Sequence, residues 1–278
     1  MAELTRVSRA RFYCFDQETE TGLDRAMDLR DPIQRIACEG PSYGRRRITA
    51  EWRRRGWTVN PKRVHRLMRE DNRLCARKPR FVRTTDSDHG RKVYPNLAQE
   101  RILTGTDQRW RADLTYVRLR EAFVFLALLL AAYSRRVMGG ALERTRKEEL
   151  TLSALPIALS RRVVEPGLVH HSDRGSPYAS TDYTDWLQQN GMAISMWRQG
   201  HPWDQAAGAS LMKTLKYEEV HRNEDRDLAE ARAALREFLE KVYNGKRLHC
   251  ALGYVPPAEF EANLASQQKE AAARRLLR

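Results

Sequence analysis

The feature that most constrains the fold of this chain is a succession of three strand patterns near its middle. Residues Arg109–Leu119 alternate apolar and polar side chains, as a half-buried strand does. The next segment, Ala122–Ala132, is apolar throughout, and Arg135–Leu142 forms the third pattern. The apolar stretch Phe123–Tyr133 covers about half of the length that a membrane span needs. These segments therefore predict an antiparallel meander with a buried middle strand.

Helix and strand patterns alternate after the meander. The predicted helices are Lys147–Ser160, Tyr178–Asn190, one that begins at Trp203, and Asp227–Asn244, and the predicted strands are Gly167–Ser172 and Met192–Met196. A β-β-β-α-β-α-β-α order is typical of an α/β sandwich built around a mixed sheet. We expect the helix from Trp203 to end near Lys216.

The N-terminal third of the chain predicts short helices instead of strands. A first helix is expected over Leu23–Cys38, and a second begins near Arg45 and ends at Gly56. Asn60 is a good N-cap, and Pro61 suits the first position of a third helix. A helix, a glycine-containing turn and a basic helix together form a helix-turn-helix pattern.

This helical segment carries most of the positive charge of the chain. The 278 residues have a formal net charge of +14, and residues 45–92 alone hold 17 Lys and Arg against 5 Asp and Glu. Such clustering indicates contact with nucleic-acid phosphates, although a solvated basic face on an ordinary helical hairpin would have the same composition. The predicted DNA-contacting residues of this segment are Arg53, Arg54, Arg55, Lys62, Arg63, Arg66 and Arg69.

Two aspartates occupy the strand patterns of the α/β region. Asp113 lies within the first strand, and Asp173 directly follows the short apolar strand that ends at Ser172. Carboxylates that neighbouring strands bring together are hard oxygen ligands of the kind that Mg²⁺ prefers. The pattern therefore indicates a metal-dependent phosphoryl-transfer site, while an ordinary surface position for either aspartate stays open.

Short motifs follow one another in a fixed order along the chain. They are Tyr43-Gly44-Arg45-Arg46-Arg47-Ile48, Ala112-Asp113-Leu114-Thr115-Tyr116, Ser134-Arg135-Arg136-Val137, His170-His171-Ser172-Asp173-Arg174-Gly175-Ser176, Trp203-Asp204, Lys213-Thr214-Leu215-Lys216, Arg247-Leu248-His249 and Pro257-Ala258-Glu259-Phe260. In this order and spacing they resemble the second-frame product of IS3-family insertion sequences, a transposase with a retroviral-integrase-like core. The resemblance covers roughly Leu23 to Leu264, and it implies an RNase H-like sandwich for the core.

The resemblance also implies a catalytic signature of two aspartates and a glutamate. Asp113 and Asp173 match the aspartates, and the position after 35 further residues, where the family has glutamate, is Ala209. The family chemistry is an in-line displacement at phosphorus, with two Mg²⁺ (or Mn²⁺) ions about 4 Å apart stabilising the attacking and leaving oxygens. Because Ala209 cannot ligate a metal ion, we expect the second metal site to be impaired.

Neighbouring carboxylates are poor substitutes for the missing glutamate. Asp204 lies five positions earlier, which is about 140° around a helix and about 7.5 Å along its axis. Glu218 and Glu219 lie beyond the expected end of the helix. Ala131 and Pro177 also depart from the residues common in the family, which favours a decaying element. An alanine introduced deliberately at position 209 stays an alternative.

Four further side chains near this site carry predictions of their own. Lys213 and Lys216 are expected to contact the phosphates of transposon ends, where a flexible ammonium suits a point-charge contact. A solvated helix face is the alternative for both. His170 and His171 are expected to be structural or DNA-proximal and not metal ligands.

By the resemblance, the chain is a DNA transposase subunit that binds insertion-sequence ends and catalyses strand cleavage and strand transfer. The implied partners are double-stranded DNA, further copies in a synaptic complex, and an upstream-frame product as a fusion partner. A catalytically inactive DNA-binding remnant or regulator of transposition is the alternative, and a transcriptional regulator is a second one. Four cysteines without a C-x-x-C pattern, and no signal-peptide pattern, favour a reduced, cytoplasmic compartment. The resemblance implies a bacterial, nucleoid-associated protein without a membrane partner.

Composition and pattern changes place the expected domain limits. We expect a poorly ordered leader over 1–22, a helix-turn-helix-like DNA-binding domain over 23–83, a linker over 84–104, the integrase-like core over 105–216, a C-terminal helical extension over 217–264 and a tail over 265–278.

Overall fold

The computed structural model describes residues 19–72, 91–99, 102–120, 122–145, 148–197, 202–220, 222 and 227–276, with the side chains of 19–28, 202–207 and 276 excepted. The chain divides into two compact units, Met1–Pro79 and Arg80–Arg278, which are called here the N-terminal unit and the core unit. Among the helices that the structure describes, none combines the length and the apolar character needed to cross a membrane.

The N-terminal unit packs three helices around a small apolar core. These are α2 (Thr19–Glu39), α3 (Arg45–Arg54) and α4 (Pro61–Glu70). Their inward side chains form one cluster of buried residues: Ile33, Ile36, Ile48, Trp52, Val59, Val64, Leu67 and Met68. The Asn60 side chain accepts a hydrogen bond from the Lys62 amide at 2.9 Å, which confirms the predicted N-cap of α4. The helix α2 begins at Thr19, inside the segment expected to be a leader.

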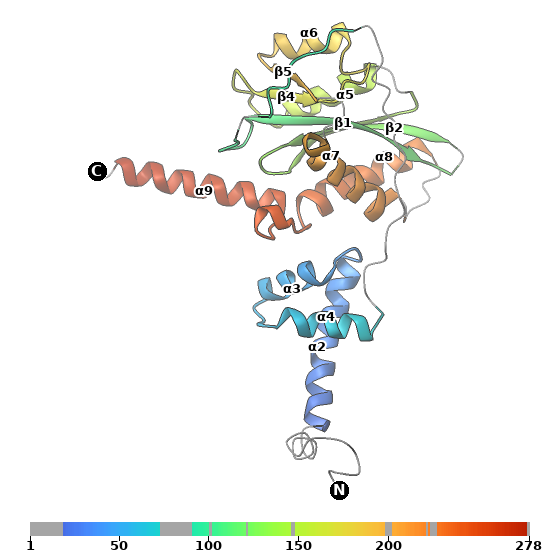
Figure 1. Ribbon diagram of the computed structural model, residues 1–278, viewed down its shortest axis with the longest axis vertical. Helices are drawn as coiled ribbons and strands as arrows, with labels where there is room; N and C mark the ends of the chain where they lie inside the picture. Colours follow the sequence, from blue (N-terminus) through green and yellow to red (C-terminus); the bar gives the residue numbers. More distant parts are fainter. Residues whose placement is uncertain are drawn as a thin grey trace. The chain divides into compact units, whose positions relative to one another are not determined.

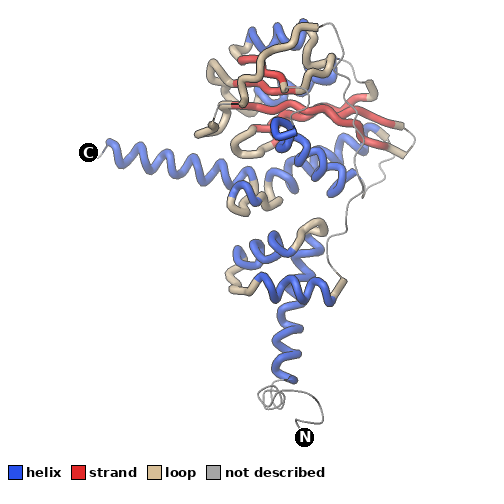
Figure 2. Tube along the Cα trace, viewed as in Figure 1, coloured by secondary structure: helices blue, strands red, loops and turns tan. Residues whose placement is uncertain are grey.

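The core unit is built on a five-stranded mixed sheet, drawn in red in Figure 2. Its strands are β1 (Arg109–Arg118), β2 (Phe123–Ala131), β3 (Val137–Glu143), β4 (Val169–Ser172) and β5 (Ala193–Met196), in the spatial order β3-β2-β1-β4-β5. The pairs β1–β2 and β2–β3 are antiparallel, whereas β1–β4 and β4–β5 are parallel. The predicted meander and mixed sheet are therefore confirmed. The apolar run became β2 because helices cover both faces of this central strand, so side chains on both faces are buried.

Helices cover both faces of the sheet (Figure 1). The sheet therefore separates two hydrophobic cores, one on each face. On one face lie α5 (Glu148–Leu159) and α6 (Thr181–Gln189), and on the other lie α7 (Pro202–Leu215) and α8 (Leu228–Glu237). Alternate residues of the central strand β2 enter opposite cores. Leu128 and Leu130, for example, pack with α7 and α8, whereas Leu129 packs with α5.

The helices after β5 change from α-helix to π-helix before they end. The helix α7 ends at Leu215, as expected near Lys216, and the chain continues without interruption as a π-helix, η1 (Lys216–Val220). Similarly, α8 continues as η2 (Phe238–Asn244) within the predicted span Asp227–Asn244. A short helix, η3 (Cys250–Leu252), precedes α9 (Pro257–Leu276). The segment expected to be a tail belongs to α9, because its alanines, Glu and Arg are all strong helix formers.

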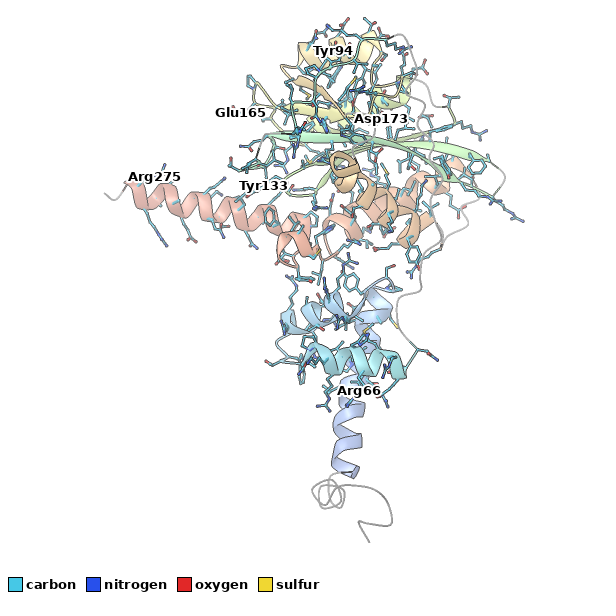
Figure 3. All side chains as sticks on the ribbon, in the orientation of Figure 1. Arg66, Tyr94, Tyr133, Glu165, Asp173 and Arg275 are labelled. Carbon is cyan, nitrogen blue, oxygen red and sulfur yellow. The ribbon has the colours of Figure 1, made fainter. Side chains whose placement is uncertain are left out.

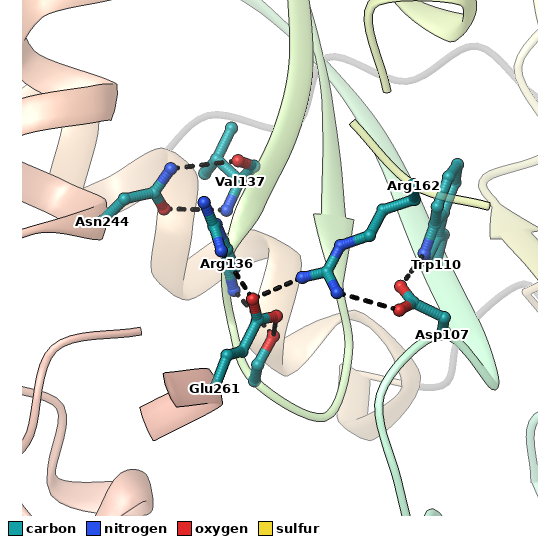
Figure 4. A network of polar contacts seen from close by, with 8 residues as sticks. Asp107, Trp110, Arg136, Val137, Arg162, Asn244 and Glu261 are labelled. Atoms are coloured by element: carbon teal, nitrogen blue, oxygen red, sulfur yellow. Dashed lines mark hydrogen bonds and ion pairs between the residues drawn. The ribbon is translucent and has the colours of Figure 1, made fainter. Parts of the chain in front are cut away.

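A buried glutamate fastens the start of α9 to the sheet (Figure 4). The carboxylate of Glu261, only 8% exposed, accepts hydrogen bonds from the Ser134 hydroxyl at 2.6 Å and from Arg136 Nη1 at 2.7 Å. It also accepts a hydrogen bond from Arg162, which in turn pairs with Asp107 at 3.1 Å. The carboxylate is therefore paired with two guanidinium groups, as a buried charge requires. Beyond Ala262 the side chains of α9 are mostly exposed.

Part of the predicted linker packs against the core unit. The backbone amide of Leu97 donates to Ser195 Oγ in β5 at 2.9 Å, and Arg91 Nη1 donates to the Ser176 carbonyl at 2.9 Å. The described residues 91–99 therefore run along the β5 edge of the sheet instead of standing free.

Candidate active site

Asp113 and Asp173 lie at equivalent positions on neighbouring parallel strands. In the register of β1 and β4, Arg111 is paired with His171, and each aspartate follows two residues later along its own chain segment. Each carboxylate is held by a nearby amide. Asp113 Oδ1 accepts from the Leu114 amide at 2.9 Å, and Asp173 Oδ1 accepts from the Gly175 amide at 2.9 Å. The parallel register thus brings together the two residues that the sequence singled out; Asp173 is labelled in Figure 3.

The two carboxylates repel each other across the strand pair. Burial, and after it the charge of Asp173, raise the pKa of Asp113 from its ordinary value of 3.8 to about 7. The Leu114 amide and the cations Lys216 and Arg111 act in the opposite direction. Because the two carboxylates repel each other, they do not ionise together easily. A cation bound between them would stabilise the form in which both are ionised.

The helix α7 passes directly over Asp113. A Cβ atom placed on Gly208 would lie 3.1 Å from Asp113 Oδ2, so the helix backbone itself approaches the carboxylate. Ala209, the next residue, is exposed and offers only a methyl group. The position expected to supply the third carboxylate therefore directly follows the residue that faces Asp113, and it carries no ligand.

Lys216 does not lie on the surface, contrary to the sequence prediction. Its side chain is only 8% exposed, and its Nζ lies 3.9 Å from the centroid of the Tyr116 ring. Burial lowers the pKa of Lys216, while the charge of Asp113 raises it. Lys216 is covered because η1 continues the helical segment over β1, whereas the sequence predicted that the packed helix would end there. Lys213, one turn earlier, is exposed, as a phosphate contact requires.

The carboxylates near α7 do not replace the missing ligand among the described side chains. Both oxygens of Glu218 accept from Arg247, from Nε and Nη2, each at 2.9 Å. That guanidinium is 6% exposed in its side chain and also donates to Thr214 Oγ1 at 3.2 Å. Glu218 is therefore committed to a buried ion pair. The side chain of Asp204 lies outside the described residues.

The donor set fits one divalent cation better than two. Among the side chains that the structure describes, no group of three or more His, Cys, Asp and Glu is placed to hold a metal ion. Asp113 and Asp173 nevertheless supply two hard carboxylates in a partly buried position, and a hard cation completes its coordination with water. A second ion would need a ligand near Ala209.

The two histidines before Asp173 are structural, as the sequence predicted. Both rings are fully buried. His170 Nε2 lies 2.9 Å from the Tyr183 hydroxyl, and His171 Nδ1 lies 2.8 Å from Ser195 Oγ. Burial lowers the pKa of His170 to about 4 and that of His171 to about 3. Both imidazoles are therefore neutral at physiological pH.

The predicted DNA-contacting residues of the N-terminal unit differ in how free they are. The side chains of Arg53, Lys62 and Arg69 are exposed and make no ion pair or hydrogen bond within the described part of the chain. Arg55 instead pairs with Glu39 at 2.6 Å and with Glu51 at 3.0 Å. The remaining predicted residues are Arg54 and Arg66, which pair with Glu51 and Glu70, and Arg63, which is half-buried. Arg66 is labelled on α4 in Figure 3.

Two residues of the site were missed by the sequence reasoning although each left a signal. Gly208 lies inside a helical pattern, where glycine lowers stability relative to alanine. Such a glycine often marks a place where the backbone closely approaches another group. Arg247 lies in the motif Arg247-Leu248-His249, but the sequence predicted no role for it. Its partner Glu218 lies 29 positions away, and no local pattern links the two.

Family comparisons agree with this geometry. Residues 24–81 match the HTH-like domain, and residues 104–202 and 190–257 match integrase core domains. Together with the mixed sheet and the paired aspartates, these matches define a polynucleotidyl transferase with an RNase H-like core and a helical DNA-binding segment.

Relatives with similar sequences identify the family more closely. The insertion element IS600 uncharacterized 31 kDa protein of Shigella sonnei is 34% identical over 264 residues, which is 94% of this chain and 97% of that protein. The transposase for insertion sequence element IS904 of Lactococcus lactis is 33% identical over 221 residues, 79% of this chain and 87% of that protein. Transposase InsF for insertion sequence IS3A of Escherichia coli K12 is 29% identical over 272 residues, with 95% and 94% covered. The chain belongs to the IS3-family transposases, which have a retroviral-integrase-like core.

Proposed function

We propose that this transposase binds insertion-sequence ends through its N-terminal unit and carries out DNA cleavage and strand transfer at Asp113 and Asp173. The observation that supports the site is the parallel register of β1 and β4, which puts Asp113 and Asp173 at matching positions, with Asp113 directly beneath α7. The proposed contacts to DNA phosphate are Arg53, Arg54, Arg55, Lys62, Arg63, Arg66, Arg69 and Lys213.

In the proposed reaction, water first attacks a phosphodiester and frees a 3′-hydroxyl, which then attacks a second phosphodiester. Asp113 and Asp173 would hold a divalent cation, Mg²⁺ or Mn²⁺, beside the scissile phosphate. When bound, such an ion stabilises the negative charge that develops on the attacking and leaving oxygens. The amides of Leu114 and Gly175 fix the orientation of the two carboxylates, so no side-chain rearrangement is needed before DNA binds.

Ala209 makes this activity weak in the proposed scheme. Loss of one carboxylate ligand costs several kcal/mol of transition-state stabilisation, or several orders of magnitude in rate. The same observation supports a second function, a catalytically inactive DNA-binding protein that occupies transposon ends and regulates transposition. Lys216 favours this second function as well, because its ammonium already interacts with Asp113.

The proposed setting follows from the family. The chain would assemble with further copies in a synaptic complex on double-stranded DNA, with an upstream-frame product as a possible fusion partner. Its proposed location is the bacterial cytoplasm, in association with the nucleoid. The domain limits expected from the sequence stay a prediction within the two units described above.

The decisive experiment restores the missing carboxylate. The Ala209→Glu variant and the unchanged chain would be compared in cleavage of a duplex that carries the terminal ends of the encoding element, with Mg²⁺ or Mn²⁺. We expect the variant to cleave at least about a hundredfold faster, since one electrostatic contact to a transition state contributes that much.

Two control variants separate ligation from other effects. Ser210→Glu adds the same charge at the next exposed position, about 100° around the helix, and should give no gain. Asp113→Asn in the Ala209→Glu background should abolish the gain. Equal activity of Ala209→Glu and Ser210→Glu would contradict a role for position 209 in the catalytic site and leave the DNA-binding function as the better one.

A further inference from the structure

The turn between α3 and α4 presents a large aromatic side chain to solvent. Trp57 is 61% exposed, although the other tryptophan of the N-terminal unit, Trp52, is 1% exposed. An isolated exposed apolar residue is common on protein surfaces. Trp57 differs from that ordinary case in two respects, namely the rigidity of its backbone and the charge of its neighbours.

The backbone at Trp57 is fixed by the end of α3. The Gly56 amide donates to the Arg53 carbonyl at 3.0 Å, and the Trp57 amide donates to the Trp52 carbonyl at 3.3 Å. Gly56 has φ +87°, the left-handed conformation that this glycine-terminated helix end requires. An apolar residue at the position of Trp57 usually packs back onto the helix. Here the backbone bonds are made, yet most of the side chain stays in solvent.

Free cations stand on both sides of Trp57 in the sequence. Arg53 belongs to the last turn of α3, and Lys62 belongs to the first turn of α4; both are exposed and unpaired among the described residues. Trp57 precedes Pro61, the first residue of α4, by only four positions. In helix-turn-helix proteins, the N-terminal residues of the second helix contact base edges in the major groove. The indole therefore lies at the end of α4 that would approach DNA.

From this placement we propose that Trp57 makes an apolar contact with duplex DNA beside the N-terminus of α4. The proposal rests on the DNA-binding function proposed above and adds a residue to it. The flat indole would cover thymine methyl groups and deoxyribose at the wall of the groove, where apolar side chains contribute to recognition. Lys62 and Arg53 would neutralise the flanking phosphates. A rigid turn favours such a contact because little side-chain and backbone freedom is lost on binding.

The test measures binding of the full chain to a fluorescein-labelled duplex of mixed sequence at several salt concentrations. Trp57→Ala should weaken binding about tenfold, the size expected when one apolar side chain no longer buries part of its surface. The slope of log affinity against log salt concentration should stay unchanged, because no phosphate contact is removed. Lys62→Gln should weaken binding and also reduce that slope by about 1. Trp57→Phe should retain most of the affinity.

Matched controls test whether a loss of DNA affinity comes from this contact, from the loss of any exposed apolar side chain, or from a change of fold. Ile102→Ala removes an 87% exposed apolar side chain from the core unit and should leave affinity unchanged. Far-ultraviolet circular dichroism should show the same helix content in Trp57→Ala as in the unchanged chain, because Trp57 lies outside the buried cluster.

Three results would overturn the proposal. One is an affinity of Trp57→Ala within about twofold of the unchanged chain while Lys62→Gln is weakened, which leaves the DNA-binding function intact but assigns Trp57 no part in it. Another is a salt slope for Trp57→Ala reduced as much as that for Lys62→Gln. A third is an equal loss in Ile102→Ala. Failure of the unchanged chain to bind duplex at low salt would instead overturn the DNA-binding function itself.

Discussion

The core unit contains buried ion pairs that have no counterpart among the described residues of the N-terminal unit. In the N-terminal unit the ion pairs are shallow: the side chains of Arg55 and Glu39 are 35% and 63% exposed. In the core unit the pair of Arg247 and Glu218 is 6% and 12% exposed, and Glu261 is 8% exposed. Surface pairs contribute little to stability, whereas breaking a buried pair is costly.

Exposed charged side chains are therefore available to a binding partner, whereas buried ion pairs stabilise the fold. Exposed cations such as Lys62 and Arg69 can exchange water and counterions for DNA phosphates without any loss of stability. Arg247 cannot do so, since it ties η1 to the segment after η2 through Glu218. By the same contact it helps to hold α7, and thus Gly208, over Asp113.

The largest expected effect is the loss of the buried pair. Arg247→Met should lower the free energy of unfolding of the core unit by about 3–5 kcal/mol, because Glu218 would keep a buried charge without a partner. Urea unfolding followed by hydrogen exchange of the β1 and β2 amides measures this. The double variant with Glu218→Gln should recover part of the loss.

A matched substitution tests whether burial is the cause. Arg232→Met removes a pair with Glu143 that is 55% and 48% exposed, and should cost about 1 kcal/mol or less. Equal losses for Arg247→Met and Arg232→Met would remove the distinction between buried and surface pairs drawn here.

Acid should destabilise the core unit through its buried histidines. The pKa of His170 is lowered from 6.5 to about 4, so between these values the unfolded chain binds the proton and the folded one does not. Stability is therefore complete above about pH 6.5 and falls as the pH drops toward 4, by about 3 kcal/mol for this residue. Urea unfolding at pH 8 and pH 5 checks the effect. His170→Gln should flatten the acid side of the profile, and an unchanged acid side in that variant would show that other groups cause it.

Asp113 should have a smaller effect of opposite sign. Its pKa is raised from 3.8 to about 7, so the folded state binds the extra proton in this window and stability falls as the pH rises through it. Asp113→Asn should therefore stabilise the core unit at pH 8 in a chelating buffer. Since Asp113 is only partly buried, we expect about 2 kcal/mol.

Divalent cations and a second aspartate provide the controls for this variant. Mg²⁺ should stabilise the unchanged chain and leave Asp113→Asn unaffected, because a ligand that binds only the folded state raises its stability. Asp185→Asn, at an exposed position of α6, should change neither value. A destabilised Asp113→Asn variant at pH 8 would show that the two carboxylates do not repel each other.

The smallest effect is expected in the N-terminal unit. Glu39→Gln breaks the exposed pair with Arg55 and should change the free energy of unfolding by about 0.5 kcal/mol or less. Thermal unfolding of the full chain, with Glu218→Gln as the buried counterpart, measures the contrast. A loss comparable to that of Glu218→Gln would mean that the surface pairs hold this unit together.

Local patterns were enough for the elements and for the pair of aspartates. The apolar run Phe123–Ala131, which follows an alternating strand pattern, predicted a buried strand, and Asn60 followed by Pro61 predicted the start of α4. The positions of Asp113 and Asp173 followed from motif spacing. These features depend on backbone preference and on the alternation of apolar residues, which neighbouring residues determine by themselves.

Tertiary packing alone decided what happens to individual charges. Lys62 and Lys216 look alike in the sequence, each in a helix with a polar face, yet one is exposed and the other lies buried over Tyr116. Glu218 looked like a surface residue beyond a helix end, and it pairs with Arg247 inside the core unit. Periodicity predicts which side of a helix is apolar, but whether a charge is solvated or buried depends on segments far away in the chain that cover it.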